Sequence, residues 1–328
     1  MELTGVHQID DTTLAQIANF PGRKILLNDL ETLPDKHAEI LSSSNGTLEL
    51  NGLEIISRTS LEILLRFKGK KLCLNGLKKL PAGFTAPTES PTYSLYLDSL
   101  KDLSDLDAIE LSKTGNSLSM DGLENASDIA LANLLKHRGS ISLNGLTDLP
   151  PLAAESLTEN HSRECHESIS LNGITALSEQ TAQYLGKVKN IGLNLDGITS
   201  MDESIAIYFN EFPGDLSLNG LQEIDQKTAG YLIAKQTGHG LSLGGLRKMD
   251  DQVAKVLSNM AAGSLKIGIT SLSDQGASYL SKMHGHLTLY QLKAISEEGL
   301  QLLSQKHPLH LSPDLFERLP AKCPARWD

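Results

Sequence analysis

The sequence predicts an α/β solenoid of about fourteen similar coils, each of which contributes one short strand to a parallel sheet and one short helix. Three observations support this fold class. The 328 residues include 59 leucines but only 4% aromatic residues, a bias that arises when one short apolar pattern is written many times. Aligning the chain with itself reveals that pattern. The residues after it also keep their register from coil to coil.

The pattern is a six-residue motif of the form L-x-L-N-G-L. Clear copies begin at residues 48, 72, 141, 169, 216 and 241, weaker copies at 25, 95, 118 and 193, and decayed copies at 1, 265, 287 and 309. The copies follow one another at intervals of about 24 residues. We therefore expect one solenoid domain over residues 1–308, with residues 1–24 as a degenerate capping repeat, and a C-terminal capping segment over residues 309–328.

Each part of the coil has a physical reason. The L-x-L alternation has the period of a strand with both leucines on one side, so the residue between them points to the opposite face. An Ala followed three residues later by a large apolar residue, as at Ala154 and Leu157, places both on one face of a helix. A Ser or Asp stands where a helix N-cap is needed, at Ser57, Ser104, Ser127, Ser178, Asp202, Asp225, Asp250, Ser273 and Ser296.

One coil departs from this plan. Between the motif copies at 72 and 95, the helix is replaced by the segment 81–93, in which Pro87 and Pro91 deny a regular helix. Loops that interrupt a regular scaffold are frequent recognition sites. We therefore expect the neighbourhood of this loop to differ in role from the rest of the chain.

These motifs resemble the leucine-rich repeat family, and the resemblance covers essentially the whole chain. The motif is a variant, because Asn follows L-x-L directly and is itself followed by Gly, whereas the common family pattern places Asn two residues later. It is similar to bacterial subtypes with units of about 23 to 24 residues. The resemblance implies a curved, horseshoe-shaped solenoid with the parallel sheet on its concave side, helices on its convex side, and ligand recognition on the sheet.

The most repeated polar feature is a column of Asn and Asp after the second leucine of the motif. A column written into nearly every coil serves the coil, so we interpret these side chains as structural hydrogen-bond partners of backbone groups at the turn or in the next coil. The alternative is a stripe that binds a ligand. The column comprises Asn28, Asn51, Asn75, Asp98, Asp121, Asn144, Asn172, Asp196 and Asn219.

The residues between the two leucines line the predicted concave face. Their middle section is a serine strip, which we interpret as solvated filler, with a flat platform for a carbohydrate or peptide as the alternative. No His or acid recurs beside these serines, so they have no base to activate them as nucleophiles. The strip comprises Ser119, Ser142, Ser170, Ser217 and Ser242.

The candidate partner-binding residues lie where the predicted concave face departs from the serine strip. Tyr93 and Tyr96 flank Leu95 beside the irregular loop and predict an exposed aromatic pair; the alternative is that Tyr93 folds back over the loop as local core. The full candidate set is Glu49, Cys73, Tyr93, Tyr96, Lys266, His286, Tyr290 and His310.

Two groups of histidines raise the possibility of metal binding or pH sensing. One comprises His161, Cys165 and His166, and the other comprises His284, His286, His307 and His310, of which His286 and His310 could meet on the sheet. Neither has the spacing of a zinc site, and the three cysteines form no CxxC pair. We expect ordinary surface histidines, and no metal or cofactor.

Charge and hydropathy exclude further classes. A net charge of −11 repels polyanions, so we expect no nucleic-acid partner. The sequence lacks a signal-peptide pattern and any apolar run long enough to span a membrane, so a cytoplasmic location is expected, with export by a signal-independent route left open. We expect a monomer, or weak self-association through sheet edges or caps.

The sequence therefore predicts a non-enzymatic scaffold that binds a protein or peptide through its concave face. The alternative is an exported bacterial effector or surface factor that recognises a host protein or glycan.

Overall fold

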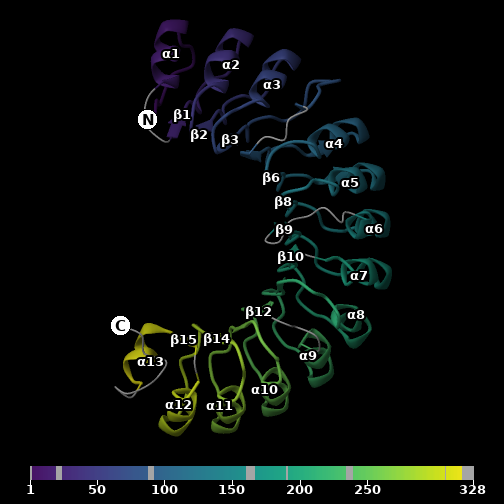
Figure 1. Ribbon diagram of the computed structural model, residues 1–328, viewed down its shortest axis with the longest axis vertical. Coiled ribbons are helices and arrows are strands. Elements are labelled where there is room, and N and C mark those ends of the chain that lie inside the picture. Colours follow the sequence, from purple (N-terminus) through teal and green to yellow (C-terminus); the bar gives the residue numbers. More distant parts are fainter. Residues whose placement is uncertain are drawn as a thin grey trace. The chain divides into compact units, whose positions relative to one another are not determined.

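The computed structural model describes residues 2–19, 24–87, 92–159, 167–189, 191–233, 239–306 and 308–319. The chain packs as two compact units, Met1–Ser170 and Leu171–Asp328. Within each unit, parallel strands form one layer and short helices form a second layer against one face of the strands (Figure 1). The predicted fold class, a solenoid of alternating strands and short helices, is confirmed.

The first unit begins with the degenerate coil, whose Glu2 forms an isolated bridge with Leu26. Its strands pair in chain order as β1 (Lys24–Leu26), β2 (Thr47–Glu49), β3 (Lys71–Cys73), β4 (Ser94–Tyr96), β6 (Ser117–Ser119), β8 (Ser140–Ser142) and β9 (Glu167–Ser170). Its helices are α1 (Asp11–Ala18), α2 (Asp35–Ser42), α3 (Arg58–Leu64), α4 (Asp105–Leu111), α5 (Asp128–Leu134) and α6 (Pro151–Glu159). A separate short pair, β5 (Asp102–Leu103) and β7 (Asn125–Ala126), leads into α4 and α5.

The second unit repeats the same order. Its strands are β10 (Ile191–Asn194), β11 (Leu216–Ser217), β12 (Gly240–Leu243), β13 (Ser264–Ile267), β14 (His286–Leu289) and β15 (Leu309–Leu311). Its helices are α7 (Glu179–Leu185), α8 (Glu203–Ala206) with the 3-10 turn η1 (Ile207–Phe209), α9 (Gln226–Ile233), α10 (Asp251–Leu257), α11 (Asp274–Leu280), α12 (Glu297–Leu303) and α13 (Pro313–Glu317). The register aligns leucine with leucine, as in Leu287 opposite Leu309, so the first residues of the expected capping segment extend the sheet.

The core lies between the two layers. Both leucines of the L-x-L pattern are buried, as Leu48 and Leu50 show. The helix residues Ala154 and Leu157, which belong to a later coil, are buried as well. This arrangement explains why one coil cannot fold alone: its apolar strand face is covered by its own helix and by the neighbouring coils together.

The predicted N-caps are confirmed. Each predicted Ser or Asp accepts a hydrogen bond from the third residue of its helix, as Ser127 does from the N–H of Ala130 at 2.9 Å. Several cap serines also donate to the Asp that opens the helix of the preceding coil. Ser57 donates to Asp35 at 2.8 Å, and Ser127 donates to Asp105. These contacts join neighbouring helices at their N-terminal ends.

The Asn and Asp column forms a ladder of hydrogen bonds from coil to coil. The backbone N–H of Asn51 donates to Oδ1 of Asn28 at 3.1 Å, and equivalent bonds run from Asn51 through Asn75, Asp98 and Asp121 to Asn144. In the second unit, the ladder runs from Asn172 through Asp196 and Asn219 to the N–H of Gly244. These contacts agree with a structural role for the column.

The serine strip is attached to the same ladder. The hydroxyls of Ser119, Ser142 and Ser217 donate at 2.6 Å to Oδ1 of Asp98, Asp121 and Asp196 in the preceding coil. Ser170 and Ser242 donate in the same way to Asn144 and Asn219. Each of these hydroxyls therefore has a structural hydrogen bond inside the coil stack that the expectation of a solvated filler did not include, while Ser142, Ser170, Ser217 and Ser242 remain partly exposed.

The glycine of the motif is required by close approach. A Cβ atom on Gly52 would lie 2.2 Å from the carbonyl oxygen of Asn28, and one on Gly76 would lie 2.2 Å from that of Asn51. Neither glycine has a positive φ. The Asn-Gly pair therefore marks a point where one coil stacks closely on the next.

We expect Asp121→Ala to lower the free energy of unfolding by about 1–3 kcal/mol, since it leaves the Asn144 N–H and the Ser142 hydroxyl without their acceptor. Denaturant unfolding measures this loss. Asp121→Asn is the matched control, because it retains the Oδ1 acceptor and should cost markedly less. Equal stability of the Ala variant and the wild type would contradict a structural role for the column.

Candidate functional site

The candidate binding surface is the face of the strands that the helices leave uncovered, called the open face below (Figure 1). Sequence-predicted site residues lie on the strands of both units, except for Tyr93, which directly precedes β4, and Tyr290, which directly follows β14. They divide into an N-terminal group in the first unit (Glu49, Cys73, Tyr93 and Tyr96) and a C-terminal cluster in the second (Lys266, His286, Tyr290 and His310). The two groups differ sharply in exposure.

Two residues of the N-terminal group are engaged by lysines of neighbouring strands. Glu49 lies 3.1 Å from Nζ of Lys24, and only 16% of its side chain is exposed. The ammonium of Lys71 lies 4.1 Å from the ring centroid of Tyr96, a cation–π contact. A partner would have to compete with these contacts within the chain.

The structure corrects the expectation that Cys73 is available to a partner. The residue is 4% exposed, and it lies between Glu49 and Tyr96 in the strand register. Burial raises the pKa of its thiol to about 11, so the thiol is neutral near pH 7. A buried, protonated thiol is a poor nucleophile and a poor metal ligand.

The expected exposed aromatic pair is wrong for Tyr93. Its side chain is fully buried, its hydroxyl donates to the carbonyl of Leu65 at 2.9 Å, and its ring meets the edge of Phe67 at 5.7 Å between centroids. Burial also raises the pKa of its hydroxyl. The alternative interpretation is the correct one: Tyr93 belongs to the local core beside the irregular loop.

The irregular loop takes the position of the missing helix and is fixed there by hydrogen bonds. Phe84 fills the core, and two glutamates of the flanking helices accept hydrogen bonds from the loop backbone: Glu62 from the N–H of Thr85 at 3.0 Å, and Glu110 from the N–H of Ala86 at 2.8 Å. The Arg58 side chain hydrogen-bonds Glu62 and, with Thr85, holds the pKa of that carboxyl below its usual range. Over residues 81–87 the loop is therefore part of the scaffold.

The C-terminal cluster is the more exposed group. The rings of His286 and His310 stack, with 6.3 Å between centroids and 7° between planes, as the sequence suggested. Tyr290 lies 6.3 Å from His310 and is 56% exposed. Lys266 is also exposed, on the strand next to β14. The fold thus brings together four residues that are up to 44 positions apart in the chain.

The two histidine groups were predicted as possible metal ligands. Among the described residues, no group of three or more His, Cys, Asp or Glu side chains could hold a metal ion. His161, Cys165, His166 and His307 lie outside the described residues. The absence of a metal or cofactor stays a prediction.

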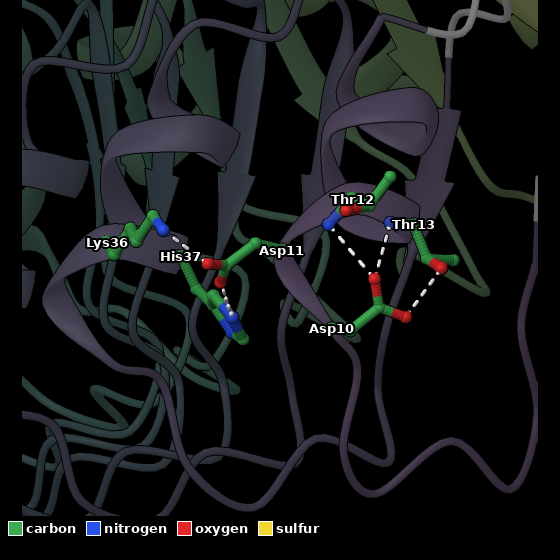
Figure 2. A network of polar contacts seen from close by, with 6 residues as sticks. All are labelled: Asp10, Asp11, Thr12, Thr13, Lys36 and His37. Carbon is green, nitrogen blue, oxygen red and sulfur yellow. Dashed lines mark hydrogen bonds and ion pairs between the residues drawn. The ribbon is translucent and has the colours of Figure 1, made fainter.

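Sequence reasoning missed a polar network that joins α1 to α2 (Figure 2). Asp10 caps α1 by accepting from the N–H groups of Thr12 and Thr13, while Asp11 pairs with both Lys36 and His37 of α2. The Asp-Asp-Thr-Thr sequence carries a cap signal, but the partner coil was not evident from it. The contacts are all within the chain, so we assign the network to the scaffold.

Tyr93→Ala should lower the free energy of unfolding by about 3–5 kcal/mol, because it empties a fully buried aromatic site. Tyr96→Ala, at a half-buried position, should change it by no more than about 0.5 kcal/mol. Denaturant unfolding of the two variants makes the comparison. Similar losses in both would show that the two tyrosines do not divide into core and surface.

The pKa of Asp11 is lowered mainly by its hydrogen bond to Lys36. We therefore expect Lys36→Ala to raise that pKa toward its ordinary value of 3.8, as followed by NMR titration of the carboxyl carbon. A lowered folded-state pKa contributes stability that is present above the unfolded-state pKa and is lost as the pH falls through the folded-state value. Asp10, whose pKa is lowered mainly by Thr13, should titrate unchanged; an unmoved Asp11 would refute the assignment.

No helix in the described part of the chain is both long enough and apolar enough to cross a membrane.

Comparison with known proteins shows the fold. No family model and no curated protein matches the sequence. A chain of the Toll–Spatzle complex from Drosophila aligns over 93% of this chain with 15% identity and a TM-score of 0.57, and the glycosylated form of that complex aligns with 14% identity and a TM-score of 0.56. The alignments cover 40% and 41% of those chains, so this chain spans about two fifths of their length. An internalin from Listeria monocytogenes aligns over 93% of this chain and 89% of its own, with 17% identity and a TM-score of 0.46. The protein has a leucine-rich-repeat fold.

Proposed function

We propose that the protein is a non-enzymatic scaffold that binds a partner protein or peptide through the open face of its sheet, the concave face of a leucine-rich-repeat coil. Repeat folds of this kind use such extended sheet surfaces for binding. We further propose that it acts in a reducing compartment, the cytoplasm of a bacterial cell. The free thiol of Cys73 and the absence of disulfide spacing among the cysteines support this location.

The observation that carries the proposal is the exposed C-terminal cluster. Tyrosine and histidine rings provide large, amphipathic contact surfaces, and aromatic residues are enriched where interfaces gain most of their binding energy. Lys266 adds a positive charge, and it is in no ion pair with a described acid. The cluster therefore fits a segment with apolar and acidic side chains.

The serine hydroxyls argue against catalysis on this face. Ser142 and Ser217 donate to Asp121 and Asp196 at 2.6 Å, and these aspartates also accept backbone N–H groups. In the described coils, the strip hydroxyls donate hydrogen bonds to Asn and Asp side chains of the ladder. A serine nucleophile needs a base that takes its proton and is poised to return it, typically histidine, and this arrangement does not supply one.

A selection experiment tests the proposal. A random peptide library displayed on phage is selected against the full chain, and the affinity of the selected peptides is measured by calorimetry. We expect acidic and apolar residues in the selected sequences. Lys266→Ser/Tyr290→Ser/His310→Ser should weaken their binding at least tenfold, because it removes the positive charge and two of the rings. Ser is the chosen replacement because it already stands at open-face positions such as Ser217 and Ser242.

The matched control is Gln252→Ala/Gln275→Ala/Glu298→Ala, which changes exposed helix residues in the same unit. It should leave the affinity unchanged. If the selected peptides bind the open-face variant as tightly as the wild type, with both proteins equally folded by circular dichroism, the cluster is not the binding site.

A further inference from the structure

A line of exposed apolar side chains crosses three consecutive helices of the first unit. Leu106 of α4, Ile129 of α5 and Leu152 of α6 are each the second residue of their helix and follow one another at intervals of 23 residues. Their exposed fractions are 75%, 55% and 46%. Since α4 packs on α5 and α5 on α6 (Figure 1), we call these three side chains the apolar ridge.

The coil does not need apolar residues at this position. In the other helices of the described chain, the second residue is polar or charged: Thr12, Lys36, Thr59, Gln180, Ser204, Lys227, Gln252, Gln275, Glu298 and Asp314. Single exposed apolar residues are ordinary, but a contiguous set on adjacent elements marks an interaction site. The ridge lies on the helix layer and is separate from the open face.

Carboxylates border the ridge. Asp105 and Asp107 flank Leu106 in the chain, and Asp128 precedes Ile129. Among the described residues, these three aspartates are in no ion pair with a cation. Asp105 and Asp107 accept hydrogen bonds from the cap serines Ser127 and Ser104. A hydroxyl is neutral, so the negative charge of the two carboxylates stays uncompensated.

The same negative border continues into a hollow at the starts of α4 and α5. Its lining includes Asp102, Asp107 and Glu124 together with one cation, Lys79. Glu124 is already paired with Lys101, but the hollow as a whole keeps an excess of carboxylates. A lysine or arginine of a partner would find complementary charge there, directly beside the ridge.

The spacing of the ridge fits a helix laid across it. Neighbouring helices pack at about 8–10 Å, and seven residues of a helix advance about 10.5 Å. A helix with an apolar residue at every seventh position would therefore set one such residue against each of Leu106, Ile129 and Leu152. We propose that the apolar ridge docks a basic amphipathic helix of a partner protein.

The test uses two synthetic alanine-rich helical peptides. Both carry leucine at every seventh position; one carries lysines around the leucines, and the other carries glutamates. Titration of each labelled peptide with the full chain at physiological salt is followed by fluorescence anisotropy. We expect the lysine peptide to bind the wild type and the glutamate peptide to bind at least tenfold more weakly.

The ridge variant is Leu106→Gln/Ile129→Gln/Leu152→Gln. Gln already occupies the same position in α7, α10 and α11, so the fold should be unchanged, and the variant keeps the net charge. It should bind the lysine peptide at least tenfold more weakly than the wild type. Gln180→Ala/Gln252→Ala/Gln275→Ala, at equivalent positions of the second unit, should bind it as the wild type does.

Three results would overturn the proposal. One is failure of the lysine peptide to bind the wild type. Another is equal binding to wild type and ridge variant, which would indicate diffuse charge attraction. The third is a wild-type dimer in sedimentation that the ridge variant does not form, which would identify a second copy of this chain as the occupant. Leu106→Gln alone, at the most exposed ridge position, gives the same comparison if the triple variant unfolds.

Discussion

The structure depends on one recurring hydrogen bond, in which the side-chain oxygen of an Asn or Asp at the strand end accepts the backbone N–H of the corresponding residue in the next coil. That N–H lies in the turn and would otherwise be half-buried without an acceptor. The bond can form only where the coils stack closely, and in most coils this closeness leaves no room for a Cβ atom at the following position, as Gly52 shows. Ser99 is an exception, since the N–H of Asp98 before it still donates to Asn75 at 3.1 Å. The Asn-Gly pair is therefore the usual consequence of the stacking distance.

Asp in the column coincides with a second donor. Each described Asp of the column, Asp98, Asp121 and Asp196, is followed one coil later by a serine that donates to the same Oδ1. A half-buried carboxylate needs more than one donor, and the hydroxyl supplies the second. Asn occurs with such a serine, as at Asn144 and Asn219, and also without one, as with Cys73 after Asn51. A serine therefore accompanies every described Asp of the column but does not by itself decide between Asn and Asp.

The residues of the proposed C-terminal binding surface occur where this column ends. After Asn219 the column continues as Gly244, Gly268, Tyr290 and Ser312, and the Gln291 side chain reaches back to donate to the Gly244 carbonyl at 2.9 Å. Because position 290 no longer serves the ladder, it carries an exposed tyrosine beside two stacked histidines. The loss of the repeat near the C-terminus is therefore also what makes room for the proposed binding surface.

Features that recur in nearly every coil were predictable from the sequence, whereas features that occur once were not. Strands, helix caps and the Ala–Leu packing pairs were predictable because each recurs in nearly every coil. A wrong assignment in one coil would disagree with the alignment of the other coils. Tyr93 and Cys73 were not predictable, because each occurs once and its exposure depends on one neighbourhood: Tyr93 on Phe67 and the carbonyl of Leu65, and Cys73 on the side chains of adjacent strands. The residues of the apolar ridge were missed for a different reason. Leu106, Ile129 and Leu152 are periodic in the sequence, yet periodic apolar residues in helices are normally core, and only their exposure in the structure shows that they lie outside the core.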